Sequence, residues 1–178
     1  RMIGVAATGL FARGAGLALQ LRLLVAGAVT GVFYPAFRQK RDAGAPLGPP
    51  YLRVVAAYTG VTWAAMAGIA VLAEPLVHLL YGEKWLGAAP LLAWLALAQC
   101  CYVALPLAHD LPLLLGRKTS LVRRTAVDTV LSLALLAIAA PFGLAWIAVS
   151  RLAHGLVGIP LYWGMMRDML EIRARDVL

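Results

Sequence analysis

Residues 129–166 read TVLSLALLAIAAPFGLAWIAVSRLAHGLVGIPLYWGMM and contain only two basic side chains, Arg151 and His154, and no acidic one. A helix needs about 20 residues to cross a bilayer core of ~30 Å, so this stretch is too long for a single span. The sequence Pro141-Phe142-Gly143 is a natural break within it, because proline and glycine interrupt helices. We therefore expect two membrane-spanning helices here, over residues 121–140 and 144–166.

The composition of the whole chain supports a membrane location. Of its 178 residues, 62% are hydrophobic and only 13% are charged, and the mean hydropathy is +0.83. An ordinary soluble domain is about 45–50% apolar and about 25% charged, so this chain has too few polar residues to cover a core. The composition excludes a soluble globular domain and a disordered segment, and it predicts an all-α integral membrane protein. Three further apolar stretches bring the predicted spans to five: residues 14–37, 54–73 and 86–108.

Lysine and arginine gather in alternate connections between these spans. The cation-rich segments are the first connection (Arg38, Lys40, Arg41, Arg53), the third (Arg117, Lys118, Arg123, Arg124) and the C-terminal tail (Arg167, Arg173, Arg175). The second connection has one cation, Lys84, and the fourth has none. Because short cytoplasmic loops carry the excess of Lys and Arg, we expect the N-terminus outside and the C-terminus in the cytoplasm. This topology explains the net charge of +8, so we expect no nucleic-acid partner. An odd number of spans starting outside predicts a fragment of a longer protein.

The stretch from Glu74 to Trp85 has the pattern of a short interfacial helix. Pro75 kinks or restarts the helix, because proline lacks an N–H and clashes with the preceding turn. Gly82 suits a helix C-terminus, and Trp85 is placed as an interfacial anchor. The next helix is expected to begin within residues 87–90.

Four motifs along the chain resemble, in their sequence and their order, motifs of the polysaccharide transporter (Wzx-type flippase) family. This family is a branch of the multidrug/oligosaccharidyl-lipid/polysaccharide exporter superfamily. The passage from Pro75 to Pro90 is similar to the family's PLV-x-LL-[YF]-G-x-x-W-x-x-A-[AP] pattern. The other three motifs are Phe33–Phe37 (FYPAF), Leu113–Arg117 (LLLGR) and Phe142–Trp146 (FGLAW). The resemblance extends over about residues 9–166.

This resemblance implies a 12–14-helix exporter of two lobes, with residues 1–178 forming part of the C-terminal lobe and the N-terminal lobe missing. It implies transmembrane flipping of undecaprenyl-pyrophosphate-linked oligosaccharides in the bacterial cytoplasmic (inner) membrane, for lipopolysaccharide, capsule or exopolysaccharide biosynthesis. Its partners are then the lipid-linked oligosaccharide and membrane lipids. A lipid II flippase or a drug exporter of the same superfamily is the alternative.

Two arginines within predicted spans are the main candidates for substrate contacts. A charged side chain in a span costs about 2.5–3.5 kcal/mol on insertion scales, so it usually faces a cavity or a partner. Arg22 lies in the first span and Arg151 in the last, with His154 three residues further on the same helix face. The pyrophosphate of a lipid-linked sugar needs cationic hydrogen-bond donors, which a guanidinium supplies. We predict that Arg22 and Arg151 hold it, assisted by His154. The alternative is that each arginine pairs with Asp128 or a carbonyl, or snorkels to the surface.

Asp128 and the remaining polar residues have simpler interpretations. Asp128 follows Arg124 by four residues, so we interpret the two as a helical ion pair; a carboxylate coupled to H⁺ or Na⁺ is the alternative. A membrane enzyme of polysaccharide assembly needs a carboxylate pair or metal cluster at one membrane face, and the second connection offers only Glu74 and Glu83. Cys100 and Cys101 are adjacent and cannot readily bridge. We therefore expect no catalytic residue, no metal site and no cofactor.

Overall fold

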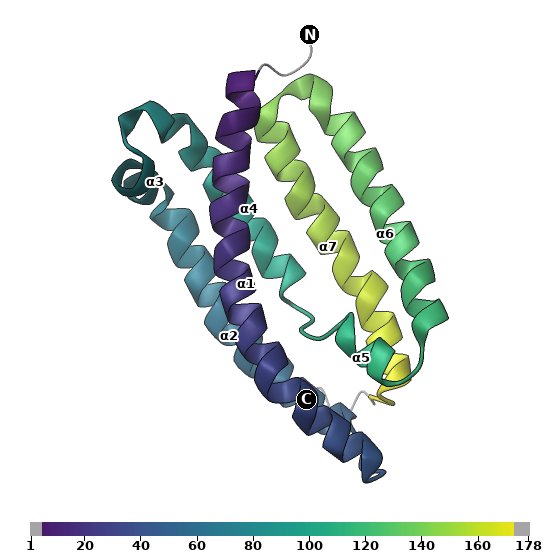
Figure 1. Cartoon of the computed structure of the whole chain (residues 1–178). Helices are drawn as coiled ribbons and strands as arrows, with labels where there is room; N and C mark the ends of the chain where they lie inside the picture. The colour runs from purple at the N-terminus through teal and green to yellow at the C-terminus, as the bar shows by residue number, and fades with distance from the viewer. Residues whose placement is uncertain (1–4, 173–178) are drawn as a thin grey trace.

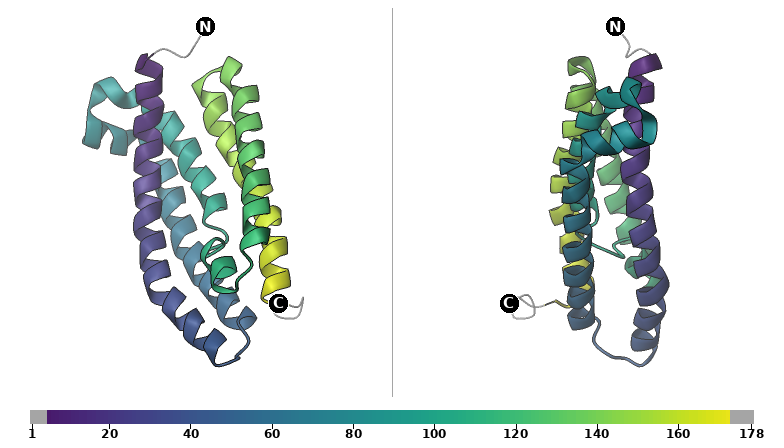
Figure 2. Two further views of the ribbon diagram at one scale, coloured as in Figure 1. Left: turned by 45° about the vertical axis from the view of Figure 1, so that its right-hand side comes forward. Right: turned by 90° about the vertical axis from the view of Figure 1, so that its left-hand side faces the viewer.

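The computed structural model describes residues 5–172, with side chains from residue 9 on except those of residues 10, 21, 24–26 and 28–30 (Figure 1). The described residues form helices and connections, with no strand among them. The elements are α1 (Val5–Asp42), α2 (Gly48–Val71), α3 (Ala73–Tyr81), η1 (Glu83–Ala88), α4 (Ala89–Tyr102), α5 (Asp110–Leu114), α6 (Lys118–Ala139), η2 (Ala140–Phe142) and α7 (Leu144–Met169). The long helices run up and down in one bundle (Figure 2).

Four helical stretches in the described part of the chain are long and apolar enough to cross a membrane. They are Gly48–Val71, Glu83–Tyr102, Lys118–Phe142 and Leu144–Met169. These stretches correspond to four of the five spans predicted from the sequence and define a multi-pass membrane protein. The break predicted at Pro141–Gly143 is confirmed: η2 ends at Phe142, and Gly143 has φ +100°, which favours glycine.

The remaining predicted span, residues 14–37, lies within α1. This helix has 38 residues, or about 57 Å at 1.5 Å per residue, so it is longer than a bilayer core is thick. Its helical character is confirmed, and its assignment as a fifth span stays a prediction. Pro35 lies inside the helix and removes the hydrogen bond to the carbonyl of Gly31. The lower part of α1 bends in Figure 2.

The predicted span 86–108 is wrong at its C-terminal end. Helix α4 ends at Tyr102, and residues 103–109 form an irregular connection to α5. Pro106 explains this end, because proline has no N–H for the helix and disfavours the helical conformation of the residue before it. Leu107 then has φ +59°, which turns the chain toward α5.

The predicted stretch around Pro75 is confirmed. Helix α2 gives way to α3, with Pro75 in the first turn of α3, and α3 ends at Gly82 with φ +82°. Helix α4 begins at Ala89, with Pro90 in its first turn.

Two buried apolar clusters lie at opposite ends of the bundle. One combines the α1–α2 connection, α5, the start of α6 and the end of α7, and its buried members include Phe37, Leu47, Leu111, Leu121 and Met166. The other combines α3, α4 and the start of α7, through Ala73, Val77, Leu92 and Ala148. The first and third connections therefore share one end of the molecule, as their common excess of cations predicts. Arg173 and Arg175 of the predicted cation-rich tail lie outside the described residues.

Helix α1 is fastened near both of its ends. Near the start, the Arg13 guanidinium carbon lies 5.5 Å from the ring centroid of Tyr81 and 5.4 Å from that of Trp85. These are cation–π distances. At the other end, Arg41 Nη1 donates a 2.7 Å hydrogen bond to the carbonyl of Leu114, the last residue of α5. This contact satisfies a backbone carbonyl that a helix end leaves free.

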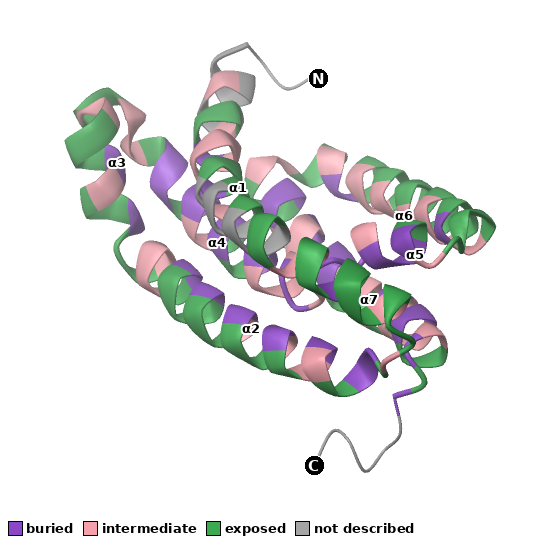
Figure 3. Cartoon of the chain, turned by 60° about the horizontal axis from the view of Figure 1, so that its bottom comes forward, coloured by how far each residue is buried: buried purple, intermediate pink, exposed green. Residues whose placement is uncertain are grey.

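The outward face of the bundle is apolar, as expected for a surface in lipid. Helix α6 is coloured mostly as exposed or intermediate in Figure 3. Its exposed side chains include Val122, Val127, Val130, Leu133 and Ile138. In water such a face destabilises the protein, whereas in a bilayer it lies in a solvent of its own polarity.

Helices α4 and α7 pack so closely that a glycine is required between them. A Cβ at Gly155 would lie 2.6 Å from Cys101 Cβ and 3.4 Å from the Ala98 carbonyl oxygen. Small residues allow such close approach of membrane helices, where dispersion and not water exclusion holds them together. Gly164 in the same helix has no such neighbour within 4 Å in the described structure.

We predict that Gly155→Ala lowers the thermal unfolding midpoint of the detergent-solubilised protein, because overpacking costs about 1–3 kcal/mol. The matched control is Gly164→Ala, which adds the same methyl group to the same helix in open space. It should leave the midpoint unchanged or raise it slightly, since alanine is the better helix former. Equal midpoints for the two variants would show that α4 and α7 are not in contact at Gly155.

Candidate functional site

A cavity of about 120 Å³, lined partly by charged and polar side chains, lies against the apolar cluster that contains Leu111 and Met166, and it shares Ala108 and Tyr162 with that cluster. Helices α1, α4, α6 and α7 and the 103–109 connection all contribute to its wall. The residues around it are Arg22, Cys101, Tyr102, Leu105, Ala108, His109, Asp128, Gly155, Gly158, Ile159 and Tyr162. Arg22 is residue 18 of the 38 in α1, and Asp128 is residue 11 of the 22 in α6. The cavity therefore lies near the middle of the bundle.

The end of α4 forms one side of this cavity, and its backbone groups are satisfied by specific partners. Trp63 Nε1 in α2 donates to the Cys100 carbonyl at 2.8 Å, and the Val103 N–H donates to the Gln99 carbonyl at 2.9 Å. The buried Tyr51 hydroxyl donates to the Pro106 carbonyl at 3.1 Å. Non-helical backbone at membrane depth is tolerated only where protein covers it or it lines a cavity, and this connection meets both conditions.

Three side chains beside the cavity form a hydrogen-bonded chain across three helices. The Tyr102 hydroxyl lies 2.8 Å from His154 Nδ1, and His154 Nε2 lies 3.0 Å from Asp128 Oδ1. The His154 side chain is 8% exposed and that of Asp128 is 24% exposed. Tyr102 hydroxyl also lies 3.0 Å from the Arg151 carbonyl oxygen. The Tyr102 hydroxyl can therefore donate its proton either to His154 Nδ1 or to the Arg151 carbonyl, depending on which His154 nitrogen carries a proton.

The distances accommodate His154 in both of its protonation states. Neutral His154 with the proton on Nε2 donates to Asp128, and its Nδ1 accepts the Tyr102 O–H. When a second proton binds, Nδ1 donates to the Tyr102 oxygen, and the hydroxyl proton turns to the Arg151 carbonyl. Asp128 accepts from Nε2 in both states.

Arg22 is the cation that lines the cavity from α1. Its Nε is buried and has no hydrogen-bond partner among the described residues. A buried, unsatisfied donor on a charged group is costly. Of the predicted site residues, Arg22 and Asp128 both line the cavity, and His154 contacts Asp128 directly.

Arg151 and Arg124 have partners away from the cavity. Arg151 donates from Nη1 to Ser132 Oγ and from Nη2 to the Ser132 carbonyl, both at 2.9 Å. Arg151 therefore pairs with a backbone carbonyl, which was the alternative to a role in holding the substrate. Arg124 donates to the Leu161 carbonyl, and Asp128 contacts His154. The predicted Arg124–Asp128 ion pair is therefore wrong. Both side chains face α7, where Arg124 contacts the Leu161 carbonyl and Asp128 contacts His154.

Two further cavity residues were not predicted from the sequence. Tyr102, the last residue of α4, contacts His154. His109 directly precedes α5, and its ring centroid lies 5.3 Å from that of Tyr162. The available signal was Pro106 within an apolar run, since interrupted membrane helices commonly form the sites of transporters.

The bundle of apolar helices defines a multi-pass membrane protein with a cavity near its middle. The chain matches the polysaccharide biosynthesis protein family over residues 1–90 and belongs to this Wzx-like exporter family. Neither the comparison with curated proteins nor the comparison with solved structures gave a match. In the described residues, no group of three or more His, Cys, Asp or Glu side chains is arranged to hold a metal ion.

We predict that Asp128→Asn and His154→Gln are energetically coupled. In a double-mutant cycle on the free energy of unfolding in detergent, contacting residues show interaction energies of about 0.5–3 kcal/mol. The matched control pairs Asp128→Asn with His78→Gln, an exposed histidine of α3, and should be additive within about 0.5 kcal/mol. Additivity in both cycles would contradict the His154–Asp128 contact.

Proposed function

We propose that this chain is part of an exporter that moves undecaprenyl-pyrophosphate-linked oligosaccharide units across the bacterial inner membrane. Its membership of the polysaccharide biosynthesis protein family supports the pathway, and its four apolar spans support a transport role. In this proposal α1 is a fifth span, and residues 1–178 form part of a C-terminal lobe opposite an N-terminal lobe.

The observation that carries the proposal is the Arg22 guanidinium in the central cavity. Arg22 lines this cavity, and a planar guanidinium suits the oxygens of a pyrophosphate. The cavity lies at mid-depth, where alternating access places the substrate of two-lobed transporters. The small volume fits contact with the phosphate groups, so the sugars and the lipid would lie outside this half of the site.

Proton coupling at Asp128 and His154 is the form of energy input that the contacts favour. His154 contacts Asp128, and Arg22 lines the same cavity as Asp128. In this proposal a proton on His154 offsets the negative charge of Asp128, which lines the cavity, whereas its loss leaves that charge facing the substrate anion. Arg151 acts in this proposal as a positioning residue, which fixes α7 against α6 through Ser132.

We predict that Arg22→Ala lowers the transport rate about tenfold or more, since a hydrogen bond to a charged group contributes about 1.5–3 kcal/mol. The assay expresses the whole protein in a bacterium lacking its own O-antigen flippase and measures surface polysaccharide. Arg123→Ala, which removes an exposed arginine from α6, is the matched control and should transport normally.

Membrane insertion of each variant is measured alongside, so that loss of protein is not mistaken for loss of transport. Normal transport by Arg22→Ala would remove Arg22 from the substrate site. Stable insertion with no polysaccharide from the parent protein would favour a lipid II or drug substrate, to be tested next in the same strain background.

We also predict the orientation of the bundle from its cations. Fluorescent-protein fusions ending at Gly44 or Gly116 should fluoresce, because both connections are expected in the cytoplasm. Alkaline phosphatase fused at Lys84 should be active, because the second connection is expected in the periplasm. The opposite pattern at all three sites would invert the topology and, with it, the proposed direction of export.

A further inference from the structure

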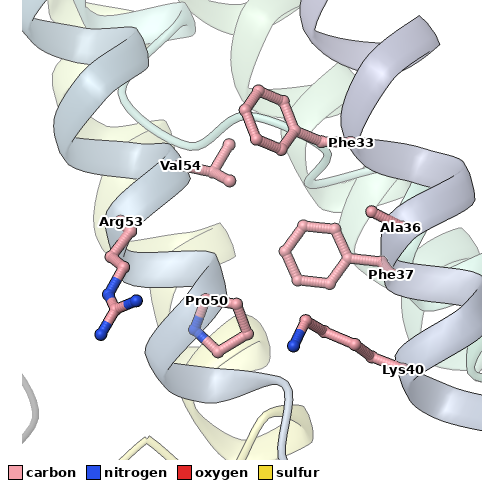
Figure 4. A pocket seen from close by; sticks show the side chains of 7 residues that line it. All are labelled: Phe33, Ala36, Phe37, Lys40, Pro50, Arg53 and Val54. Atoms are coloured by element: carbon pink, nitrogen blue, oxygen red, sulfur yellow. The ribbon is translucent and has the colours of Figure 1, made fainter. Parts of the chain in front are cut away.

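A second cavity, of about 370 Å³, lies at the cation-rich end of the bundle between α1 and α2. Figure 4 shows it as a groove with Phe33, Ala36 and Phe37 on one side and Pro50 and Val54 on the other. It is separate from the central cavity, with which it shares no lining residue.

The floor of this groove belongs to the buried apolar core. Phe37 is 2% exposed and Val54 is 5% exposed, and both are members of the cluster at this end. The ring of Phe37 packs edge-on against Tyr51, with 6.4 Å between centroids. The floor is therefore held in place from behind and does not depend on an occupant.

The mouth of the groove carries one cation from each helix. Lys40 of α1 and Arg53 of α2 both border it, and both residues are exposed. In Figure 4 the Lys40 amine lies between the two helices, whereas the Arg53 guanidinium extends along the outer side of α2. Within the described part of the chain, neither forms an ion pair, and the neighbouring acid Asp42 is engaged by Arg41 at 2.5 Å. Their positive charge is thus available to an occupant.

An apolar groove with two cations at its mouth is complementary to an amphipathic anion. In a bilayer, such a groove is filled by an acyl chain, so the cations determine which headgroup accompanies it. Cationic side chains near the membrane surface attract anionic lipids by about a factor of five each. We propose that this groove binds an anionic glycerophospholipid, with its phosphate at Lys40, close enough to the surface charge of Arg53 to be attracted by it, and one acyl chain against Phe37 and Val54.

This lipid is distinct from the proposed transport substrate, and its site does not require transport. The groove lies beside α1, whose middle carries Arg22, so a bound lipid would hold the lower parts of α1 and α2 at a fixed separation. The proposal therefore stands or falls by lipid binding alone.

The test is electron spin resonance of the whole protein in phosphatidylcholine vesicles containing acyl-spin-labelled phosphatidylglycerol or phosphatidylcholine. The immobilised fraction of each probe gives their relative affinities for the site. We expect phosphatidylglycerol to be preferred by about 25-fold, from two cations at about fivefold each. The double variant Lys40→Gln/Arg53→Gln should abolish this preference.

Two further variants separate the groove from general surface charge. Arg117→Gln/Lys118→Gln removes the same charge from exposed residues that do not line the groove, and it should keep the preference. Ala36→Trp fills the groove from an exposed position and should lose the immobilised phosphatidylglycerol although both cations remain. Circular dichroism confirms that each variant stays helical.

Three outcomes would overturn the proposal. In the first, the parent protein immobilises phosphatidylglycerol no more than phosphatidylcholine, which would occur if a second copy or another part of the protein covers the groove. The control pair loses the preference as fully as Lys40→Gln/Arg53→Gln, which makes the attraction a property of the whole surface. Ala36→Trp binds phosphatidylglycerol like the parent, which leaves the acyl chain outside the groove.

Discussion

The fold around the central cavity depends on hydrogen-bond donors for the backbone carbonyls at the end of α4, which lies inside the bundle. A membrane offers no water to the free carbonyls of a helix end, and each unsatisfied group costs several kcal/mol. The indole of Trp63 and the hydroxyl of Tyr51 supply the donors from α2, so that the irregular 103–109 connection is possible at this depth. These hydrogen bonds cover backbone carbonyls next to the space that Arg22, Tyr102 and Asp128 line.

The polar contacts in the middle of the bundle depend on the apolar packing around them. The two clusters hold the helices together at the two ends of the bundle, and the Gly155 contact brings α7 close enough to α4 for His154 to reach Tyr102. In a medium as apolar as lipid, packing contributes more to such contacts than hydrophobicity does. The hydrogen-bonded chain then joins α4, α6 and α7 through polar contacts, so a change in protonation at His154 is felt by three helices.

The length of the apolar runs was sufficient to predict most of the fold, because a bilayer imposes a nearly fixed span. The turn at Pro141–Gly143 and the restart at Pro75 followed from local backbone chemistry, which neighbouring helices do not alter. The end of α4 was not predicted, since Pro106 lies in an uninterrupted apolar run and its effect depends on donors from another helix. The same limit applies to the site. Arg22, Arg151 and His154 were selected as candidates because they are basic residues within predicted spans. Asp128 was assigned to an ion pair with Arg124, because the two are four residues apart on one helix. Only the packing of α6 against α7 could replace Arg124 with His154 as the partner of Asp128.

The two attachments of α1 have a mechanical consequence. Helix α1 is about 57 Å long, and a continuous helix does not change length easily. Near one end its Arg13 contacts Tyr81 and Trp85, and at the other end its Arg41 is hydrogen-bonded to α5. A cation–π contact at an accessible site contributes only about 0.5–1 kcal/mol, so this end of α1 is held mainly by the packing of Phe11, Ala15 and Ala18 in the cluster with α3 and α4. Arg22, in the middle of α1, is therefore held between two fixed points, which keep its side chain at the level of Asp128.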